Sequence, residues 1–253
     1  GLAHGTYKVA ESTHEGYAAL SESPEFTLTA TADIRITNEP LMLEIKKTDS
    51  YTNDGMAGVE FKLWSEAENE YVAVEQMAAG EYVASAGSAT TSITDADGSI
   101  KVYYLPAGDY RLEEVSDLAQ MGYTKREPIT FTVGDTNGMS DPVVVEMTND
   151  PTVLILSKSD AATREPMDGA TFRLLDANNA VVKLTETAKG SYKADADGAE
   201  AFTTKHGEAY IRYLPYGTYT VEELTAPDGY TMDTPKPVTI TDASKAQNPA
   251  RVA

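Results

Sequence analysis

The feature that most constrains the fold of this chain is an internal repeat with a period of about 110 residues. Four landmarks recur in the same order in both copies, and matching positions lie 109 to 111 residues apart. The landmarks are Lys47-Thr-Asp and Lys158-Ser-Asp, Gly58-Val-Glu-Phe61 and Gly169-Ala-Thr-Phe172, Gly80-Glu-Tyr82 and Gly190-Ser-Tyr192, and Gly98 and Gly207. A repeat of this length is long enough to fold as a domain. We therefore predict two complete domains, residues 41–150 and residues 151–253.

Residues 1–40 match only the last third of a repeat. A short turn-and-strand motif occurs three times, as LAHGTYKVAES at Leu2–Ser12, LPAGDYRLEEV at Leu105–Val115 and LPYGTYTVEEL at Leu214–Leu224. In the N-terminal copy it is followed by EGY, FTL and IRITNEP. A segment this short cannot enclose a core by itself, so we expect residues 1–40 to be the C-terminal part of a preceding domain.

Short runs of alternating apolar and polar residues fill both repeats. In the first repeat they are LEIKK, FKLW, IKVYY, YRLEE, ITFTV and VVVEM, bounded by Gly, Asp, Asn and Pro. This pattern is typical of half-buried strands, and helical periodicity of useful length is missing. We predict an all-β fold of short antiparallel strands in a sandwich, joined by turns such as Asp97-Gly98. Residues 65–80 and 176–190 are the least regular and are expected to form longer loops.

Several strands place a polar residue where the alternation predicts an apolar one. Successive side chains of a strand point to opposite faces, so residues two apart share a face. The polar residues in phase with apolar neighbours are Lys47, Glu114 and Asn149 in the first repeat, Lys158 and Glu223 in the second, and Glu11 and Asn38 in the N-terminal segment. A lysine, a glutamate and an asparagine are therefore expected to point inward.

Two interpretations of these inward residues are open. One is a buried Lys–Glu ion pair capped by an amide, or strand ends at which inward positions already meet water. The other is chemical: a desolvated lysine amine is a nucleophile, and a protonated carboxyl group can polarise an amide carbonyl. Attack of the amine on the asparagine carbonyl, with loss of ammonia, would then form an intramolecular isopeptide bond.

The ordered motifs resemble those of CnaB domains, which are prealbumin-like β-sandwiches of Gram-positive pilins and surface adhesins. The resemblance rests on the K-x-D strand, the G-[AV]-x-F strand, the G-x-Y-x-[VL]-x-E strand with APDGY (Ala226–Tyr230) after it, and the terminal [IM]-T-N-[DE]-P. It covers nearly the whole chain and implies tandem Ig-like or prealbumin-like sandwiches. The first repeat departs from it at Asp117–Tyr123, which leaves the conformation of that loop open.

The resemblance also implies roles for the inward residues. Glu114, Glu223 and Glu11 would be catalytic, Lys47 and Asn149 would form a crosslink, and Lys158 and Asn38 would take part in two others. Asn248 is near the C-terminus, but it aligns with Asp141, ahead of the final strand. We therefore expect the acceptor for Lys158 and the lysine for Asn38 to lie outside this sequence, which would be a slice of a longer array.

Composition excludes several classes of partner. The 40 acidic and 20 basic residues give a net charge of −20, which repels phosphate backbones and anionic lipid, so nucleic acid is not expected. The sequence has no cysteine and no apolar run of the length that a membrane span needs. The Asp95-Ala-Asp-Gly98 and Asp195-Ala-Asp-Gly198 turns lack the later glutamate of a calcium loop, so we expect neither metal nor cofactor.

The sequence therefore predicts a structural role. We expect a non-enzymatic stalk or shaft segment of a bacterial cell-surface protein or pilus, outside the cell, with adjacent modules or pilus subunits as partners. The alternative is an adhesin module that binds a host protein or glycan through its loops.

Overall fold

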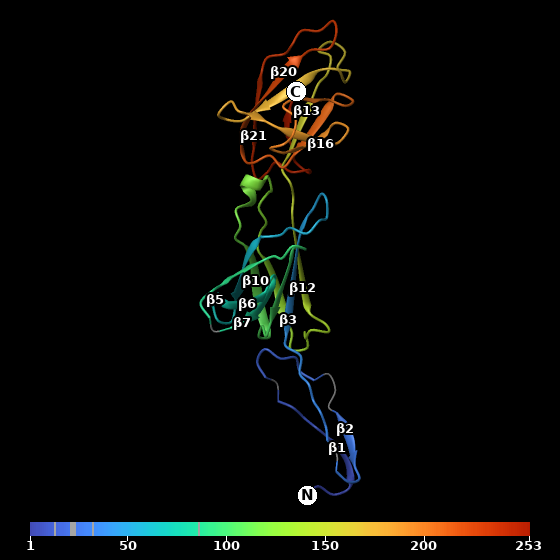
Figure 1. The fold of residues 1–253 in the computed structure, drawn as a ribbon, viewed down its shortest axis with the longest axis vertical. Helices are drawn as coiled ribbons and strands as arrows, with labels where there is room; N and C mark the ends of the chain where they lie inside the picture. Colours follow the sequence, from blue (N-terminus) through green and yellow to red (C-terminus); the bar gives the residue numbers. More distant parts are fainter. Residues whose placement is uncertain (13, 21–23, 32, 86) are drawn as a thin grey trace. The chain divides into compact units, whose positions relative to one another are not determined.

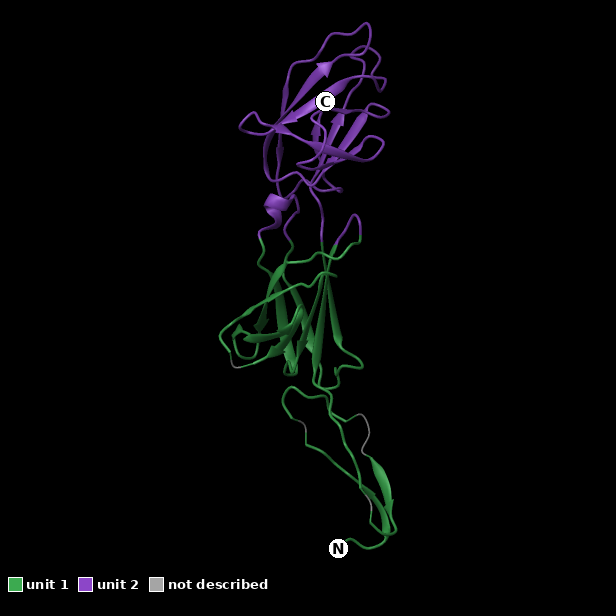
Figure 2. Ribbon diagram, viewed as in Figure 1, with its two compact units in different colours: residues 1–48, 53–116, 126–148 green, residues 49–52, 117–125, 149–253 purple. Residues whose placement is uncertain are grey.

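The computed structural model describes every residue except 13, 21–23, 32 and 86, and its regular structure is almost entirely β-strand (Figure 1). The chain divides into two compact units (Figure 2). Unit 1 comprises Gly1–Thr48, Asn53–Ser116 and Arg126–Thr148, and unit 2 comprises Asp49–Thr52, Asp117–Lys125 and Asn149–Ala253.

The first repeat forms two five-stranded sheets, one with the order β11-β10-β4-β5 and β8 beside β4, the other with the order β12-β3-β9-β7-β6. Their strands are β3 (Met42–Asp49), β4 (Glu60–Ser65), β5 (Glu70–Tyr71), β6 (Val74–Ala78), β7 (Glu81–Ala84), β8 (Thr91–Ile93), β9 (Ser99–Tyr103), β10 (Gly108–Glu114), β11 (Ile129–Val133) and β12 (Val143–Asn149). The core takes alternate residues from both sheets, such as Ile45 and Ile100 from one and Phe61 and Leu112 from the other.

The second repeat has the same arrangement, with sheet orders β16-β17-β19-β13-β22 and β15-β14-β20-β21, the latter with β18 beside β14. Its strands are β13 (Val153–Ser157), β14 (Thr171–Leu175), β15 (Val181–Val182), β16 (Leu184–Ala188), β17 (Ser191–Ala194), β18 (Phe202–Thr203), β19 (Glu208–Arg212), β20 (Gly217–Thr225), β21 (Lys236–Ile240) and β22 (Ala250–Val252). Leu154, Phe172 and Ile211 lie at the centre of its buried cluster. The predicted all-β sandwich of short strands is therefore confirmed.

The strand pairing differs from the prediction in one respect, because some neighbouring strands are parallel. The pairs are β7 with β9, β17 with β19, and β13 with β22. After β7 the chain crosses to the other sheet, where β8 pairs with β4, and then returns as β9. A strand that leaves a sheet and returns after such a crossover can run in the same direction as the strand it left.

The two segments expected to be long loops contain short strands instead. Residues 65–80 include β5 and all of β6, and residues 176–190 include β15 and all of β16. Only one end of β6 is buried, at Val74, so the segment shows no clear alternation. The loop of the first repeat that departs from the CnaB motif, Asp117–Tyr123, contains a 3-10 helix, η1 (Leu118–Met121). The Asp117 side chain accepts a hydrogen bond from Ala119 N at the start of this helix.

The N-terminal segment repeats one hairpin of the two domains. Strands β1 (Gly5–Lys8) and β2 (Glu25–Leu28) pair with Tyr7 opposite Phe26, just as β10 and β11 pair with Tyr110 opposite Phe131. These rings stack at centroid distances of 5.7 and 5.9 Å, respectively. The repeated motif therefore specifies the same local hairpin in both places.

No helix among the described residues is long and apolar enough to cross a membrane.

Candidate functional site

The inward lysine of the first repeat lies near the end of β3. Lys47 is fully buried, whereas its neighbour Lys46 is exposed, as the alternation predicts. Lys47 N donates to Gly98 O at 2.8 Å, and the Gly98 backbone is left-handed with a φ of 76°. A side chain at Gly98 would place its Cβ 2.3 Å from Lys47 O, so only glycine fits here. The recurring glycine landmark thus anchors the strand that carries the lysine.

The Lys47 amine is surrounded by protein. Its Nζ lies 3.8 Å from Glu114 Oε2, and the side chains of Lys47 and Glu114 are 0% and 5% exposed. It also lies 3.3 Å from the sulfur of Met56 and donates to Thr48 O at 3.4 Å. Glu114 ends β10 and is paired with Phe61 of β4. The two groups therefore lie close together in the protein interior, where burial of a charge is costly.

The predicted acceptor is also buried. Asn149 is 0% exposed and ends β12, the strand that neighbours β3 in its sheet. Its Nδ2 donates to Thr124 O at 3.0 Å, and its backbone O accepts from Ser50 N at 3.0 Å. These two bonds fix the asparagine backbone and the orientation of its amide group.

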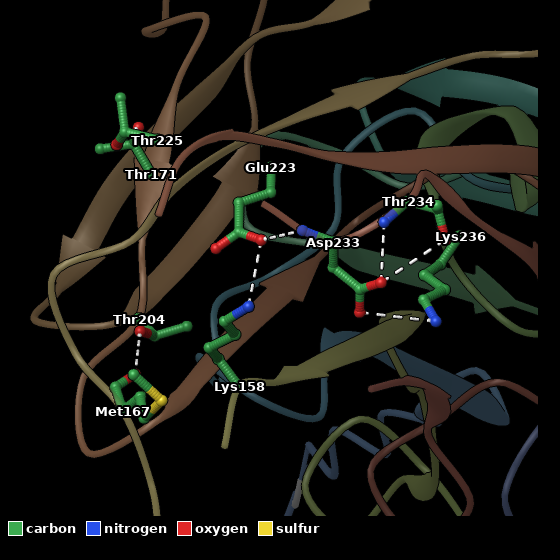
Figure 3. Close-up of polar contacts among 9 residues, drawn as sticks. All are labelled: Lys158, Met167, Thr171, Thr204, Glu223, Thr225, Asp233, Thr234 and Lys236. Atoms are coloured by element: carbon green, nitrogen blue, oxygen red, sulfur yellow. Dashed lines mark hydrogen bonds and ion pairs between the residues drawn. The ribbon is translucent and has the colours of Figure 1, made fainter. Parts of the chain in front are cut away.

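The second repeat brings its lysine and glutamate together in the same way (Figure 3). Lys158 Nζ lies 3.0 Å from Glu223 Oε2, and the two side chains are 16% and 2% exposed. Asp233 N donates to the same carboxylate oxygen at 2.7 Å. Glu223 Oε1 is buried and has no hydrogen-bond partner among the described residues. Gly207 repeats the role of Gly98, since its O accepts from Lys158 N at 2.7 Å.

Asn248 lies in a turn of the second repeat. Its backbone N donates to Lys245 O at 2.8 Å, and its side-chain Nδ2 donates to Ala243 O at 3.1 Å. The acceptor for Lys158 stays a prediction.

The N-terminal segment also brings its two predicted residues together. Asn38 Nδ2 donates to Glu11 Oε1 at 2.8 Å. Glu11 is exposed, and the role predicted for it stays a prediction. Strands β1 and β2 form a two-stranded sheet that no second sheet covers among the residues that the structure describes.

Sequence reasoning missed the residues that complete the surroundings of both lysines. Met56, Thr124 and Asp233 contact the lysine, asparagine or glutamate from loops between strands. Loop residues follow no alternation, so only the tertiary fold identifies them. The repeated K-x-D landmark was a usable signal for Asp49 and Asp160, because each is held by hydrogen bonds from the following turn.

A family model of prealbumin-like domains agrees with this architecture. The family model "SpaA: Prealbumin-like fold domain" matches the chain twice, over residues 42–151 and 152–250. Similar solved structures include a streptococcal ancillary pilin, with 26% identity over 99% of this chain and 75% of that one and a TM-score of 0.39. The shaft pilin SpaA of Lactobacillus rhamnosus GG has 17% identity over 84% of this chain and 98% of that one, with a TM-score of 0.37. A search of curated protein sequences found no match.

Proposed function

Because this chain belongs to the SpaA prealbumin-like fold domain family, we propose that it is a structural stalk or shaft segment of a bacterial cell-surface protein or pilus. Its modules would be stabilised by autocatalytic isopeptide bonds and would pack end to end with adjacent modules or pilus subunits outside the cell. The observation that carries the proposal is the burial of three polar side chains. Lys47 is fully buried beside the buried carboxyl group of Glu114, and Lys47 lies on β3, the strand next to β12, which ends in buried Asn149.

The proposed reaction uses only these three side chains. Glu114 takes a proton from the Lys47 ammonium, which leaves a neutral amine and a neutral acid. The Nζ lone pair attacks Asn149 Cγ while the protonated Glu114 donates to the developing oxyanion. A proton then passes from the attacking nitrogen to Nδ2 through Glu114. The Cγ–Nδ2 bond breaks, one ammonia molecule leaves, and the Nζ–Cγ amide remains.

Such a bond has a mechanical purpose. It would join the strand near the start of the first domain to the strand at its end, and so close a loop of about 100 residues, a length worth roughly 4–5 kcal/mol in loop-closure models. Tension along the chain would then pass through the crosslink. The reaction occurs once per site, so no turnover of an external substrate is expected.

Intact mass spectrometry of the purified chain tests the proposal. We expect a mass lower than the sequence mass by one ammonia for the bond between Lys47 and Asn149. Tryptic digestion should release one branched peptide that contains both residues, because trypsin does not cleave at an acylated lysine. A full sequence mass, with separate linear peptides, would leave only the buried ion pair and refute the crosslink.

The adhesin alternative has one observation in its favour. A groove in unit 1 is lined by residues that include Tyr71, Tyr104, Tyr110, Glu68 and Glu70. Aromatic faces and carboxylates together suit sugar rings and hydroxyl groups. Screening against a glycan array, with Tyr71→Ala as the control, tests it. Absence of binding, or binding that the substitution leaves unchanged, would argue against this groove as a glycan site.

A further inference from the structure

Unit 1 contains a recurring arrangement that we call a glycine–tyrosine dock, made of Gly16 and Tyr17 packed on Tyr104. Leu41 N donates to Gly16 O at 2.8 Å, and Tyr104 N donates to Leu41 O at 2.9 Å. The rings of Tyr17 and Tyr104 meet edge to face at a centroid distance of 5.3 Å. A Cβ atom at Gly16 would lie 2.8 Å from Tyr104 O, so the glycine allows the backbones to touch.

Unit 2 contains the same dock, made of Gly122 and Tyr123 packed on Tyr213. Thr152 N donates to Gly122 O at 2.8 Å, and Tyr213 N donates to Thr152 O at 3.2 Å. The rings of Tyr123 and Tyr213 meet edge to face at 5.5 Å. A Cβ atom at Gly122 would lie 2.2 Å from the Tyr213 carbonyl carbon. Tyr104 and Tyr213 share an unusual left-handed backbone, with φ values of 60° and 61°.

An aspartate completes the dock in unit 2. Asp49 Oδ2 accepts hydrogen bonds from the hydroxyl groups of Tyr123, at 2.9 Å, and Tyr213, at 2.8 Å. Its Oδ1 accepts from the backbone N–H groups of Tyr51 and Thr52. The aspartate therefore binds both tyrosines of the dock at one oxygen. Burial, and then the bond to Asp49, raise the pKa of Tyr213, so its hydroxyl group remains a donor at neutral pH.

The second repeat contains part of the same dock again: Asp160, Gly229 and Tyr230 correspond to Asp49, Gly122 and Tyr123. Asp160 Oδ1 accepts from Ala162 N and Thr163 N, and Asp160 Oδ2 accepts from Tyr230 OH at 2.6 Å. Gly229 has a φ of 85°, close to the 76° of its two counterparts. Here no second tyrosine among the described residues donates to Asp160, and a Cβ at Gly229 would meet nothing within 4 Å. Tyr230 is 47% exposed.

We propose that Asp160, Gly229 and Tyr230 form a docking surface for a further prealbumin-like module. The partner would present a left-handed tyrosine followed by Leu-Pro, as this chain does at Tyr104-Leu-Pro and Tyr213-Leu-Pro. Its hydroxyl group would donate to Asp160 Oδ2, its ring would pack on the edge of Tyr230, and its backbone would lie against the Cα of Gly229. This inference rests on the proposed stalk function but does not need the isopeptide bond.

The test lengthens the full chain by one repeat. Ala250 aligns with Val143, so residues 147–253 placed after Ala253 continue the register and supply a second copy of Tyr213. Hydrogen exchange of the amides in residues 226–232 should slow about tenfold relative to the 253-residue chain, because docking removes local opening. The same long chain with Tyr213→Ala in the added copy should lose this protection. The proposal would be overturned if the amides of residues 226–232 exchanged at an unchanged rate in the long chain while the amides of its added strands were protected, which shows that the added repeat is folded.

A pair of glycine substitutions in the 253-residue chain gives a second, independent test. Gly122→Ala and Gly229→Ala carry the same left-handed strain, but only the first meets a tyrosine backbone. Gly122→Ala should therefore lower the melting temperature about twofold more than Gly229→Ala. Equal decreases in melting temperature would mean that Gly122 does not pack against Tyr213, and would overturn the dock. The mass of the same samples reports the isopeptide bond separately, so either idea can fail without the other.

Discussion

At the scale of single residues, the two lysines differ in how strongly their surroundings favour chemistry. Lys47 is fully buried at 3.8 Å from its glutamate, whereas Lys158 is 16% exposed and makes a 3.0 Å ion pair. The full burial of Lys47 suits the attack that we propose for it, which makes the first repeat the place to test the bond.

Glu114→Gln should stop the crosslink while the fold is kept, since glutamine has nearly the same shape but cannot accept the proton from Lys47. General acid and base catalysis is worth about 100-fold or more, so bond formation should slow by at least that factor. Intact mass after a time course measures it. Glu223→Gln is the matched control and should lose ammonia at the original rate. Complete bond formation in Glu114→Gln would remove Glu114 from the mechanism.

Asp160 offers a titration that is independent of the crosslink. The hydrogen bond from Tyr230, followed by those from the turn after Asp160, lowers the pKa of Asp160 to about 2. These bonds favour the charged carboxylate, so Tyr230→Phe should raise the pKa toward the ordinary value of 3.8. Stability from this contact is present above pH 3.8 and is lost as the pH falls through about 2. Carbon-13 NMR titration measures the shift, and Tyr216→Phe, which removes a bond to Asp242, should leave Asp160 unchanged.

At the scale of elements, the thrice-repeated motif encodes a turn and a strand together. The tyrosine hydroxyl group donates to the carbonyl four residues upstream in every copy, from Tyr7 to Ala3, Tyr110 to Pro106 and Tyr219 to Pro215. The bond closes the turn before the strand that carries the glutamate. Burial raises the pKa of both Tyr110 and Tyr219 to about 12, so each hydroxyl group keeps its proton at neutral pH.

Tyr219→Phe should therefore lower the unfolding free energy of the second repeat by about 1 kcal/mol, the net worth of one intramolecular hydrogen bond. Tyr7→Phe removes the matching bond from an exposed hairpin, where water replaces it, and should cost nothing measurable. Urea denaturation followed by circular dichroism compares the two. A cost for Tyr219→Phe no larger than that for Tyr7→Phe would mean that the turn does not need this bond.

At the scale of the whole molecule, the structure is a series of similar modules rather than one large core. Each sandwich has its own buried cluster, and a paired lysine and glutamate recur in both. Only the first repeat contains all three residues of the proposed crosslink in this sequence. The stabilities of the two repeats should therefore respond differently to the same substitution.

The expected difference can be measured with Trp64, the single tryptophan, which lies in the first repeat. Glu114→Gln should lower the unfolding free energy reported by Trp64 fluorescence, because it prevents the crosslink. Glu223→Gln removes only an ion pair, and circular dichroism reports its cost. The excess for Glu114→Gln should be roughly 4–5 kcal/mol, the loop-closure contribution of the bond. Similar costs for the two variants would mean that the bond adds no stability.

The sequence by itself determined the fold class, the repeat and the strands that carry Lys47, Glu114 and Glu223. These features are local or periodic: alternation sets which face a residue occupies, and Gly98 and Gly207 mark turns that only glycine permits. The parity also predicted the burial of Asn149 at the end of β12.

Only the tertiary structure decided the parallel pairing of β7 with β9, the exposure of Glu11, and the contacts of Met56 and Asp233. Only the tertiary structure also decided that the hydroxyl groups of Tyr123 and Tyr213 both donate hydrogen bonds to Asp49. Each depends on which segments meet after long crossovers, or on whether a second sheet covers a strand. Alternation within one strand carries no information about either, because it fixes the face of a residue but not what lies against that face.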